Sequence, residues 1–208
     1  MFISSPERPR AVLLLGHGAG GGVDAPDLEA LTRLSRDRTA VLRFEQPWRT
    51  AGKRVAPAPA RLDLGWQAAR AYVREQFADL PLFLGGRSAG ARVACRSVVA
   101  DAPDEVAGVI ALSFPLHPPG RPESSRAAEL LGPGCPVLVI QGERDPFGTP
   151  TEIATTVADA PHHSMVAVPG CAHEFKPAKR GPLDPDGVAD LLVTSVREFL
   201  DDLLRGRE

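Results

Sequence analysis

The chain has 208 residues, of which 43% are hydrophobic and 24% charged, and its formal net charge is −2. This length and composition are typical of one soluble globular domain, which we expect to span residues 1–208. The near balance of charges gives no reason to expect nucleic acid or an anionic membrane as a partner. No apolar run reaches the ~18 residues of a membrane span, and the charged, proline-containing first ten residues do not resemble a signal peptide. A cytoplasmic location is therefore the default expectation.

The three cysteines are Cys95, Cys135 and Cys171, and no two of them form a C-x-x-C pair. This odd number and wide spacing predict neither a disulfide framework nor a zinc cluster. Cys95 falls within the helix after Ser88 and is expected in the core, and for Cys171 a buried packing role is favoured over a reactive thiol beside His173. No metal site or organic cofactor is predicted.

Six short apolar runs predict strands, and the first of them, which does not alternate, suits a strand buried on both faces of a parallel sheet. In chain order they are residues 11–15, 39–44, 80–85, 106–114, 136–141 and 165–168. Between and after them, helical spacing predicts helices at 27–38, 62–78, 89–101, 124–131, 151–160 and 186–205. The proline-rich segments 47–63 and 115–125 are predicted to be loops. This alternation predicts an α/β fold in which helices cover both faces of a parallel sheet of about six strands.

The third predicted strand is followed by Gly86-Arg87-Ser88-Ala89-Gly90, which fits the G-x-S-x-G pattern of a nucleophile elbow. A serine that projects clear of the sheet must sit on a sharp turn with strained backbone angles. The chain passes close to itself there, so the flanking positions can carry little side chain. The helix that follows directs its N-terminal N–H groups at the serine, where they favour negative charge. Ser88 is thus the candidate nucleophile, although the pattern alone is also met in plain tight connections.

Four segments whose residues could take part in a reaction follow predicted strands: the glycine loop 16–22, Ser88, the turn 143–145 and His173. In parallel sheets, ligands bind beyond the carboxyl ends of the strands. We therefore expect these four segments to lie together. A serine hydrolase needs such a set, because a histidine must take the serine proton and a carboxylate must orient that histidine.

The candidate base can be found by elimination among the five histidines. His162 and His163 precede the last predicted strand, which places them at the opposite end of the sheet. His117 comes before any candidate acid, and His17 is expected to order the glycine loop through hydrogen bonds. His173 follows the last strand and completes the order Ser…Asp…His.

The candidate acid is Asp145 or Glu143, which stand two residues apart in the same turn. Asp145 also suits a turn or the cap of the following helix. Glu143 is nearer the strand end and is expected to point outward or to pair with an arginine. We favour Asp145.

Four motifs of this chain resemble those of α/β-hydrolases: Gly16-His17-Gly18-Ala19-Gly20-Gly21, Gly86-Arg87-Ser88-Ala89-Gly90, Gln141-Gly142-Glu143-Arg144-Asp145-Pro146-Phe147-Gly148 and Ala172-His173-Glu174-Phe175. The resemblance covers nearly the whole chain. It is greatest to the small lid-less group related to dienelactone hydrolases and to the testis-expressed, chromatin-complex-associated hydrolase-like proteins.

This resemblance implies that Ser88 is the nucleophile, Asp145 the acid and His173 the base. It further implies that the backbone N–H groups of Ala89 and Ala19 form the oxyanion hole, with Gly20 as the alternative to Ala19. Only ten residues precede the first predicted strand, so the two leading strands of the full fold are expected to be absent. The usual place of a lid domain holds only residues 115–125, so no lid is expected. Dienelactone hydrolases use a cysteine nucleophile, and with Ser88 in that position their substrate does not carry over.

The sequence thus predicts a serine esterase that cleaves small-molecule esters or thioesters through an acyl-enzyme. A peptidase would use the same residues with a different pocket, and a hydrolase-like module that only binds a protein partner is the alternative from another class. The basic residues Arg49, Lys53, Arg54 and Arg61 follow the second predicted strand. They either receive an acidic substrate or simply form a solvated loop, which is the commoner role.

Overall fold

The structure is a computed structural model and describes residues 1–100 and 106–206. Its centre is a seven-stranded sheet in the order β1-β3-β2-β4-β5-β6-β7. The strands are β1 (Phe2–Ser4), β2 (Ala11–Gly16), β3 (Thr39–Phe44), β4 (Leu82–Arg87), β5 (Gly108–Leu112), β6 (Val137–Gly142) and β7 (His163–Val168). All neighbouring pairs are parallel except β1 and β3. From β2, the chain adds β3 on one side and β4 to β7 on the other. The carboxyl ends of these parallel strands all lie at the same end of the sheet.

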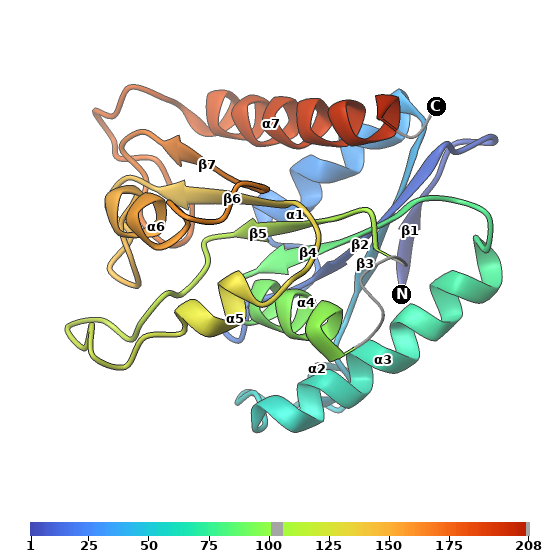
Figure 1. Cartoon of the computed structure of the whole chain (residues 1–208), viewed down its shortest axis with the longest axis horizontal. Helices are drawn as coiled ribbons and strands as arrows, with labels where there is room; N and C mark the ends of the chain where they lie inside the picture. The colour runs from blue at the N-terminus through green and yellow to red at the C-terminus, as the bar shows by residue number, and fades with distance from the viewer. Residues whose placement is uncertain (101–105, 207–208) are drawn as a thin grey trace.

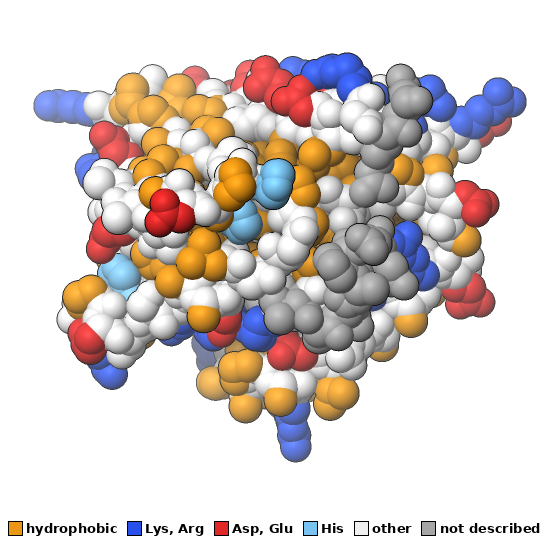
Figure 2. Space-filling view, viewed as in Figure 1, with side chains coloured by type: hydrophobic (Ala, Val, Ile, Leu, Met, Phe, Trp, Pro, Cys, Tyr) orange, Lys and Arg blue, Asp and Glu red, His pale blue; other side chains and the backbone are white. Residues whose placement is uncertain are grey.

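Helices cover both faces of this sheet (Figure 1). The α-helices are α1 (Pro26–Leu31), α2 (Pro47–Thr50), α3 (Pro59–Gln76), α4 (Ala89–Ala100), α5 (Ala127–Leu131), α6 (Pro150–Thr156) and α7 (Pro185–Arg205), and a 3₁₀ helix spans Thr32–Asp37. In Figure 1, α1 and α7 lie on the upper side of the sheet, and α3 and α4 lie on the lower side. Figure 2 shows acidic and basic side chains along the outer surface of α7.

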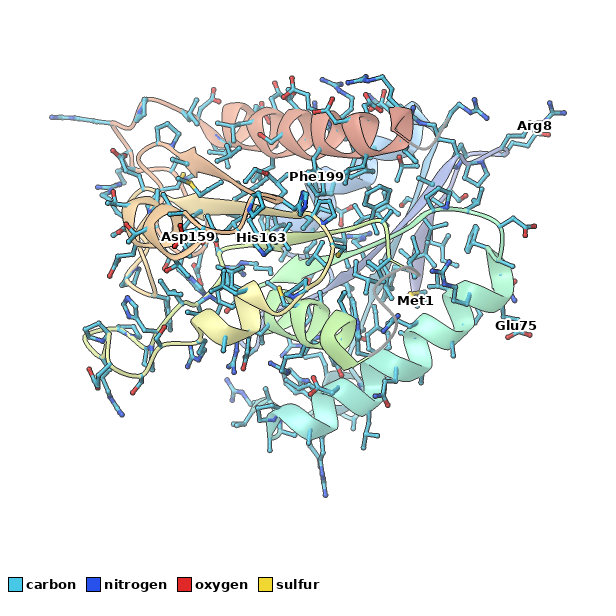
Figure 3. The ribbon with its side chains drawn as sticks, viewed as in Figure 1. Met1, Arg8, Glu75, Asp159, His163 and Phe199 are labelled. Atoms are coloured by element: carbon cyan, nitrogen blue, oxygen red, sulfur yellow. The ribbon has the colours of Figure 1, made fainter. Side chains whose placement is uncertain are left out.

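Two hydrophobic cores form because alternate residues of each buried strand face opposite sides. In β2, Leu14 belongs to the core shared with α3 and α4, whereas Leu13 and Leu15 belong to the core shared with α1 and α7. Phe199 points from α7 toward the sheet (Figure 3), and its ring meets that of Phe83 edge-on at 6.4 Å. Strands buried on both faces explain why these segments read as unbroken apolar runs.

The prediction of about six strands missed one. β1 pairs antiparallel with β3 at the sheet edge, with Phe2 opposite Arg43. One strand therefore precedes β2, where none was expected. It has three residues, and Phe2 and Ile3 remain about half exposed, so it lacks the buried apolar run by which the other strands were found.

The prediction of a loop over residues 47–63 was wrong in part. Helix α2 begins at Pro47 and α3 begins at Pro59, so both start on a proline. Proline favours the first position of a helix, because its fixed φ suits the helix and its missing N–H has no partner there. The prolines in this segment therefore mark helix starts as well as loops.

Other boundaries shifted by a few residues. The helix predicted at 27–38 is α-helical only to Leu31 and continues as a 3₁₀ helix, which ends at the left-handed residue Arg38. The helix predicted to end at Ala160 ends at Thr156. Residue 101, the predicted end of the helix after the elbow, lies outside the described residues.

The segment between β5 and α5 contains neither helix nor strand over the described residues 113–126. No lid domain is therefore inserted at this position, as expected. Among the helices that the structure describes, none combines the length and the apolar character needed to cross a membrane.

The backbones of β2, β4 and α4 approach one another closely where these elements meet. A Cβ placed on Gly86 would lie 2.4 Å from the carbonyl oxygen of Gly16, and one placed on Gly90 would lie 2.2 Å from the same oxygen. Both distances are far inside van der Waals contact. The two fixed glycines of the G-x-S-x-G pattern are thus required by packing against β2.

We therefore expect Gly90→Ala to lower the free energy of unfolding by about 2 kcal/mol or more, because backbone must move to admit the methyl group. Gly20→Ala is the matched control, since a Cβ there meets no atom within 4 Å. Gly20→Ala should raise the free energy of unfolding by at most about 0.5 to 1 kcal/mol, because alanine makes the unfolded chain less flexible. Urea unfolding of both variants measures the difference, and equal stabilities would contradict this account.

Candidate active site

Ser88 lies at the sharp turn between β4 and α4. It has a φ of 52°, a left-handed conformation that non-glycine residues seldom adopt. Its N–H donates to the carbonyl oxygen of Leu112 at 2.9 Å, which anchors the turn to the end of β5. The sequence therefore places a strained serine at the carboxyl edge of the sheet, as the elbow pattern predicts.

Ser88, His173 and Asp145 form one hydrogen-bonded chain. The Oγ atom of Ser88 lies 2.9 Å from Nε2 of His173. The Nδ1 atom of His173 lies 2.8 and 3.0 Å from the two carboxylate oxygens of Asp145. Because the carboxylate accepts from Nδ1–H, the lone pair of Nε2 faces the serine hydroxyl. The three residues come from the ends of β4, β6 and β7, so only the fold brings them together.

Asp145 is held by further donors in the interior, where its side chain is 0% exposed. The amide of Gln141 donates to its Oδ2 at 2.9 Å, and the N–H of Phe147 donates to its Oδ1 at 2.9 Å. The ring of Phe147 also packs on that of His173, with centroids 4.2 Å apart. These contacts fix both the carboxylate and the imidazole plane.

His17 orders the glycine loop after β2, as predicted. Its Nε2 accepts from the N–H of Gln46 at 3.1 Å, so Nδ1 carries the proton and donates to the carbonyl oxygen of Gly18 at 2.8 Å. The side chain is buried, and burial lowers the pKa of His17 below its usual value. A neutral imidazole is therefore required for both hydrogen bonds. The loop comes close to Ser88: a Cβ on Gly18 would lie 3.5 Å from that of Ser88.

An ion pair formed by Arg87, the residue before Ser88, was not found from the sequence. Nε of Arg87 lies 3.2 Å from Oδ2 of Asp27, and the side chains are 12% and 3% exposed. Nη2 of Arg87 also donates to the carbonyl oxygen of His173 at 3.2 Å. Burial raises the pKa of Asp27, and the guanidinium of Arg87 opposes that rise. No sequence signal links the two residues, which stand 60 positions apart and meet only across the fold.

The remaining candidates lie elsewhere or make other contacts. Nε2 of His117 bonds to Glu152 at 3.2 Å, and His163 lies at the start of β7 with its Nε2 on the carbonyl oxygen of Leu130 (Figure 3). Glu143 is exposed, and its Oε2 accepts from the N–H of Gly170. Of the alternatives weighed from the sequence, the structure thus brings neither Glu143 nor another histidine to Ser88.

The basic residues that follow β3 do not form one cluster. Lys53, Arg54 and Arg61 are exposed, and only Arg49 lines a groove near Ser88. The cysteines Cys95, Cys135 and Cys171 are buried and unpaired, and burial was expected for Cys95 and Cys171. Burial raises the pKa of the Cys171 thiol, which keeps this neighbour of His173 protonated.

A mostly parallel sheet with a strained serine between strand and helix is the architecture of α/β-hydrolases. A model of the family described as "Alpha/beta hydrolase domain" matches residues 9–201. The chain belongs to this family.

Solved structures with the same fold include a serine hydrolase homologue from Coxiella burnetii, with a TM-score of 0.72 and 19% identity over 93% of this chain and 89% of that one. An α/β serine hydrolase without a lid from Xanthomonas campestris gives a TM-score of 0.67 and 22% identity over 95% and 87% of the two chains. Est1E from Butyrivibrio proteoclasticus gives a TM-score of 0.73 and 16% identity over 96% of this chain and 90% of that one. Identities this low establish a common fold.

The buried His17 predicts a pH dependence of stability. In the unfolded chain, His17 binds a proton near pH 6.5, whereas the folded chain binds it only at lower pH. Unfolding therefore takes up a proton in this window, and the free energy of unfolding should rise with pH until about 6.5, by at most about 1.4 kcal/mol per pH unit.

Urea unfolding between about pH 5 and pH 8 measures this slope. His17→Asn, which cannot titrate, should show a shallower slope than the wild type. His163, whose pKa burial also lowers, is present in both proteins and cancels in the comparison. Parallel curves would show that His17 contributes nothing to the slope.

Proposed function

We propose that this protein is a serine hydrolase that cleaves small esters or thioesters through an acyl-enzyme on Ser88. The observation that carries the proposal is the continuous hydrogen-bonded chain from Ser88 through His173 to Asp145, at 2.9 and 2.8 Å. A serine hydroxyl is a weak nucleophile until a base takes its proton. In this chain each atom has the partner that the reaction requires.

The first step follows from that geometry. Oγ of Ser88 attacks the ester carbonyl carbon while Nε2 of His173 takes the hydroxyl proton. Asp145 stabilises the imidazolium through Nδ1–H and keeps the tautomer correct. The proton then passes from Nε2 to the departing alcohol, and the acyl group stays on Ser88. Water repeats the same steps to release the acid.

The developing oxyanion needs backbone donors. Ala89 is the first residue of α4, where helical N–H groups have no partner within the helix and the helix dipole favours negative charge. Ala19 and Ala89 line the same small pocket, whereas Gly20 lines a different groove. This placement supports the N–H groups of Ala89 and Ala19 as the oxyanion hole.

The rival interpretation is a hydrolase-like module that binds a partner without turnover. Such a module has no need for a buried carboxylate, a strained serine and an oriented imidazole in hydrogen-bonded sequence. The names of similar structures also favour esterase activity, among them a carboxyl esterase from Bacillus coagulans at 14% identity. Likeness at that level makes ester hydrolysis the first reaction to assay.

Labelling by a fluorophosphonate probe tests the nucleophile. The wild type should be labelled, and Ser88→Ala should lose both labelling and ester hydrolysis while it still unfolds cooperatively. The matched control is Ser164→Ala, which removes an exposed hydroxyl from β7 and should retain both. Equal labelling of Ser88→Ala would exclude Ser88 as the nucleophile, and absent labelling of the wild type would favour the binding module.

The choice of acid is tested by two matched carboxylate-to-amide changes. Asp145→Asn should lower kcat by about 10³- to 10⁴-fold, because the amide fixes the wrong imidazole tautomer. Glu143→Gln should change kcat by less than about threefold. Adding His173→Ala to Ser88→Ala should cost little more activity, since the members of such a unit act together. A larger effect of Glu143→Gln would reverse the assignment.

A further inference from the structure

Two recesses of very different size are lined by the sequence neighbours of Ser88, one by Ala89 and the other by Arg87. The small pocket is lined by Ala19 and Ala89 of the candidate oxyanion hole and closed by Trp48, Leu62 and Val93. The space open to the centre of a water molecule is about 10 Å³, which is just enough for one water. A methyl group is of similar size, so the space inside this pocket suits an acetyl group better than a longer chain.

The second recess, the groove, measures about 630 Å³ by the same criterion. Its apolar floor consists of Phe175, Val188 and Leu192, all less than a tenth exposed. Its rim carries Arg49, Lys176 and Glu174. The groove therefore suits a bulky, largely apolar group with a polar margin.

The two recesses lie on opposite faces of the sheet. Leu62 and Val93 belong to the core that α3 and α4 share, whereas Val188 and Leu192 belong to the core of α1 and α7. Ser88 lies at the sheet edge between them. An ester bound to Ser88 must therefore place its two halves on different sides.

The proton path decides which half goes where. His173 delivers its proton to the oxygen of the leaving alcohol, so that oxygen must lie within hydrogen-bond reach of Nε2. The groove is lined by Glu174 and Phe175, which directly follow His173, and by Arg87, whose Nη2 contacts the carbonyl oxygen of His173. No residue of the 173–177 segment lines the small pocket. The alcohol therefore points into the groove, and the acyl group points into the small pocket.

We propose that the substrates are acetyl esters of bulky, apolar alcohols. This inference rests on the proposed function and names its substrate class. In the step that forms the acyl-enzyme, the bond from Oγ of Ser88 to the carbonyl carbon forms and the bond to the alcohol oxygen breaks. The proton of Ser88 leaves with the alcohol by way of His173, and the acetyl group remains.

The experiment crosses two substrate series with two sets of variants. In the acyl series, 2-naphthylmethyl acetate is compared with the corresponding butanoate. In the alcohol series, 2-naphthylmethyl acetate is compared with ethyl acetate, because both alcohols need protonation to leave. The measured quantities are ratios of kcat/KM within each series, so a general loss of activity cancels.

The small pocket is enlarged by Val93→Ala. This change should raise the ratio of butanoate to acetate about tenfold, since each methylene that gains a buried site is worth about fourfold. Its matched control is Val98→Ala, which removes the same groups from the same helix at the same 1% exposure. Val98→Ala should leave the ratio as in the wild type.

The groove is filled by Ala189→Trp on α7, a residue that lines it. The ratio of naphthylmethyl acetate to ethyl acetate should fall about tenfold, because the apolar alcohol loses its buried site. Ala189→Leu should give an intermediate fall and guards against misfolding of the larger variant. Ala68→Trp, on an exposed position of α3, is the control and should leave the ratio unchanged.

The outcomes separate this inference from the function on which it rests. If Ser88 is labelled by the fluorophosphonate but Val93→Ala alters only the alcohol ratio and Ala189→Trp only the acyl ratio, the orientation is reversed. If the wild type cleaves butanoate or longer acyl esters as well as acetate, the acetyl assignment is wrong. If Ser88 is not labelled at all, the proposed hydrolase function fails and takes this inference with it.

Discussion

The site depends on a contact between backbones. The carbonyl oxygen of Gly16 lies so close to Gly86 and Gly90 that neither can carry a side chain. This contact joins the end of β2 to the turn between β4 and α4, and it places the glycine loop beside Ser88. A left-handed serine costs on the order of 1–3 kcal/mol, which the surrounding structure must offset. The offset comes from two hydrophobic cores, one on each face of the sheet.

Two buried side-chain networks then orient what the backbone contact brings together. On one side, Gln141 and the N–H of Phe147 hold the carboxylate of Asp145, which in turn holds His173. On the other side, His17 bridges the N–H of Gln46 and the carbonyl oxygen of Gly18. Each network fixes a tautomer, because each imidazole has one nitrogen that must donate and one that must accept. His173 and the glycine loop after β2 are thereby positioned independently of each other.

The sequence predicted the parts whose signal is local. Buried parallel strands have continuous apolar sequences, so the order of the strands along the chain could be predicted. The glycines on either side of Ser88 reflect one close backbone approach, so Ser88 could be predicted as well. The rule that ligands bind at the carboxyl ends of strands then selected His173 and Asp145. β1 was not predicted, because three partly exposed residues in an edge strand show no hydrophobic periodicity. The helix starts at Pro47 and Pro59 were not predicted, because proline is common in loops as well as at the first position of a helix.

The ion pair of Arg87 and Asp27 shows the kind of feature that no local signal reveals. Arg87 precedes Ser88 at the end of β4, and His173 follows β7, with β5 and β6 between these strands in the sheet. The guanidinium of Arg87 contacts both Asp27 on α1 and the carbonyl oxygen of His173. Replacing buried ion pairs by apolar groups is often neutral for stability, so attraction alone is a weak account of this one. A geometric account fits better: the planar guanidinium presents several donors in fixed directions. One side chain therefore ties the strand that carries Ser88 to the loop that carries its histidine, and Asp27 compensates the charge that this tie buries.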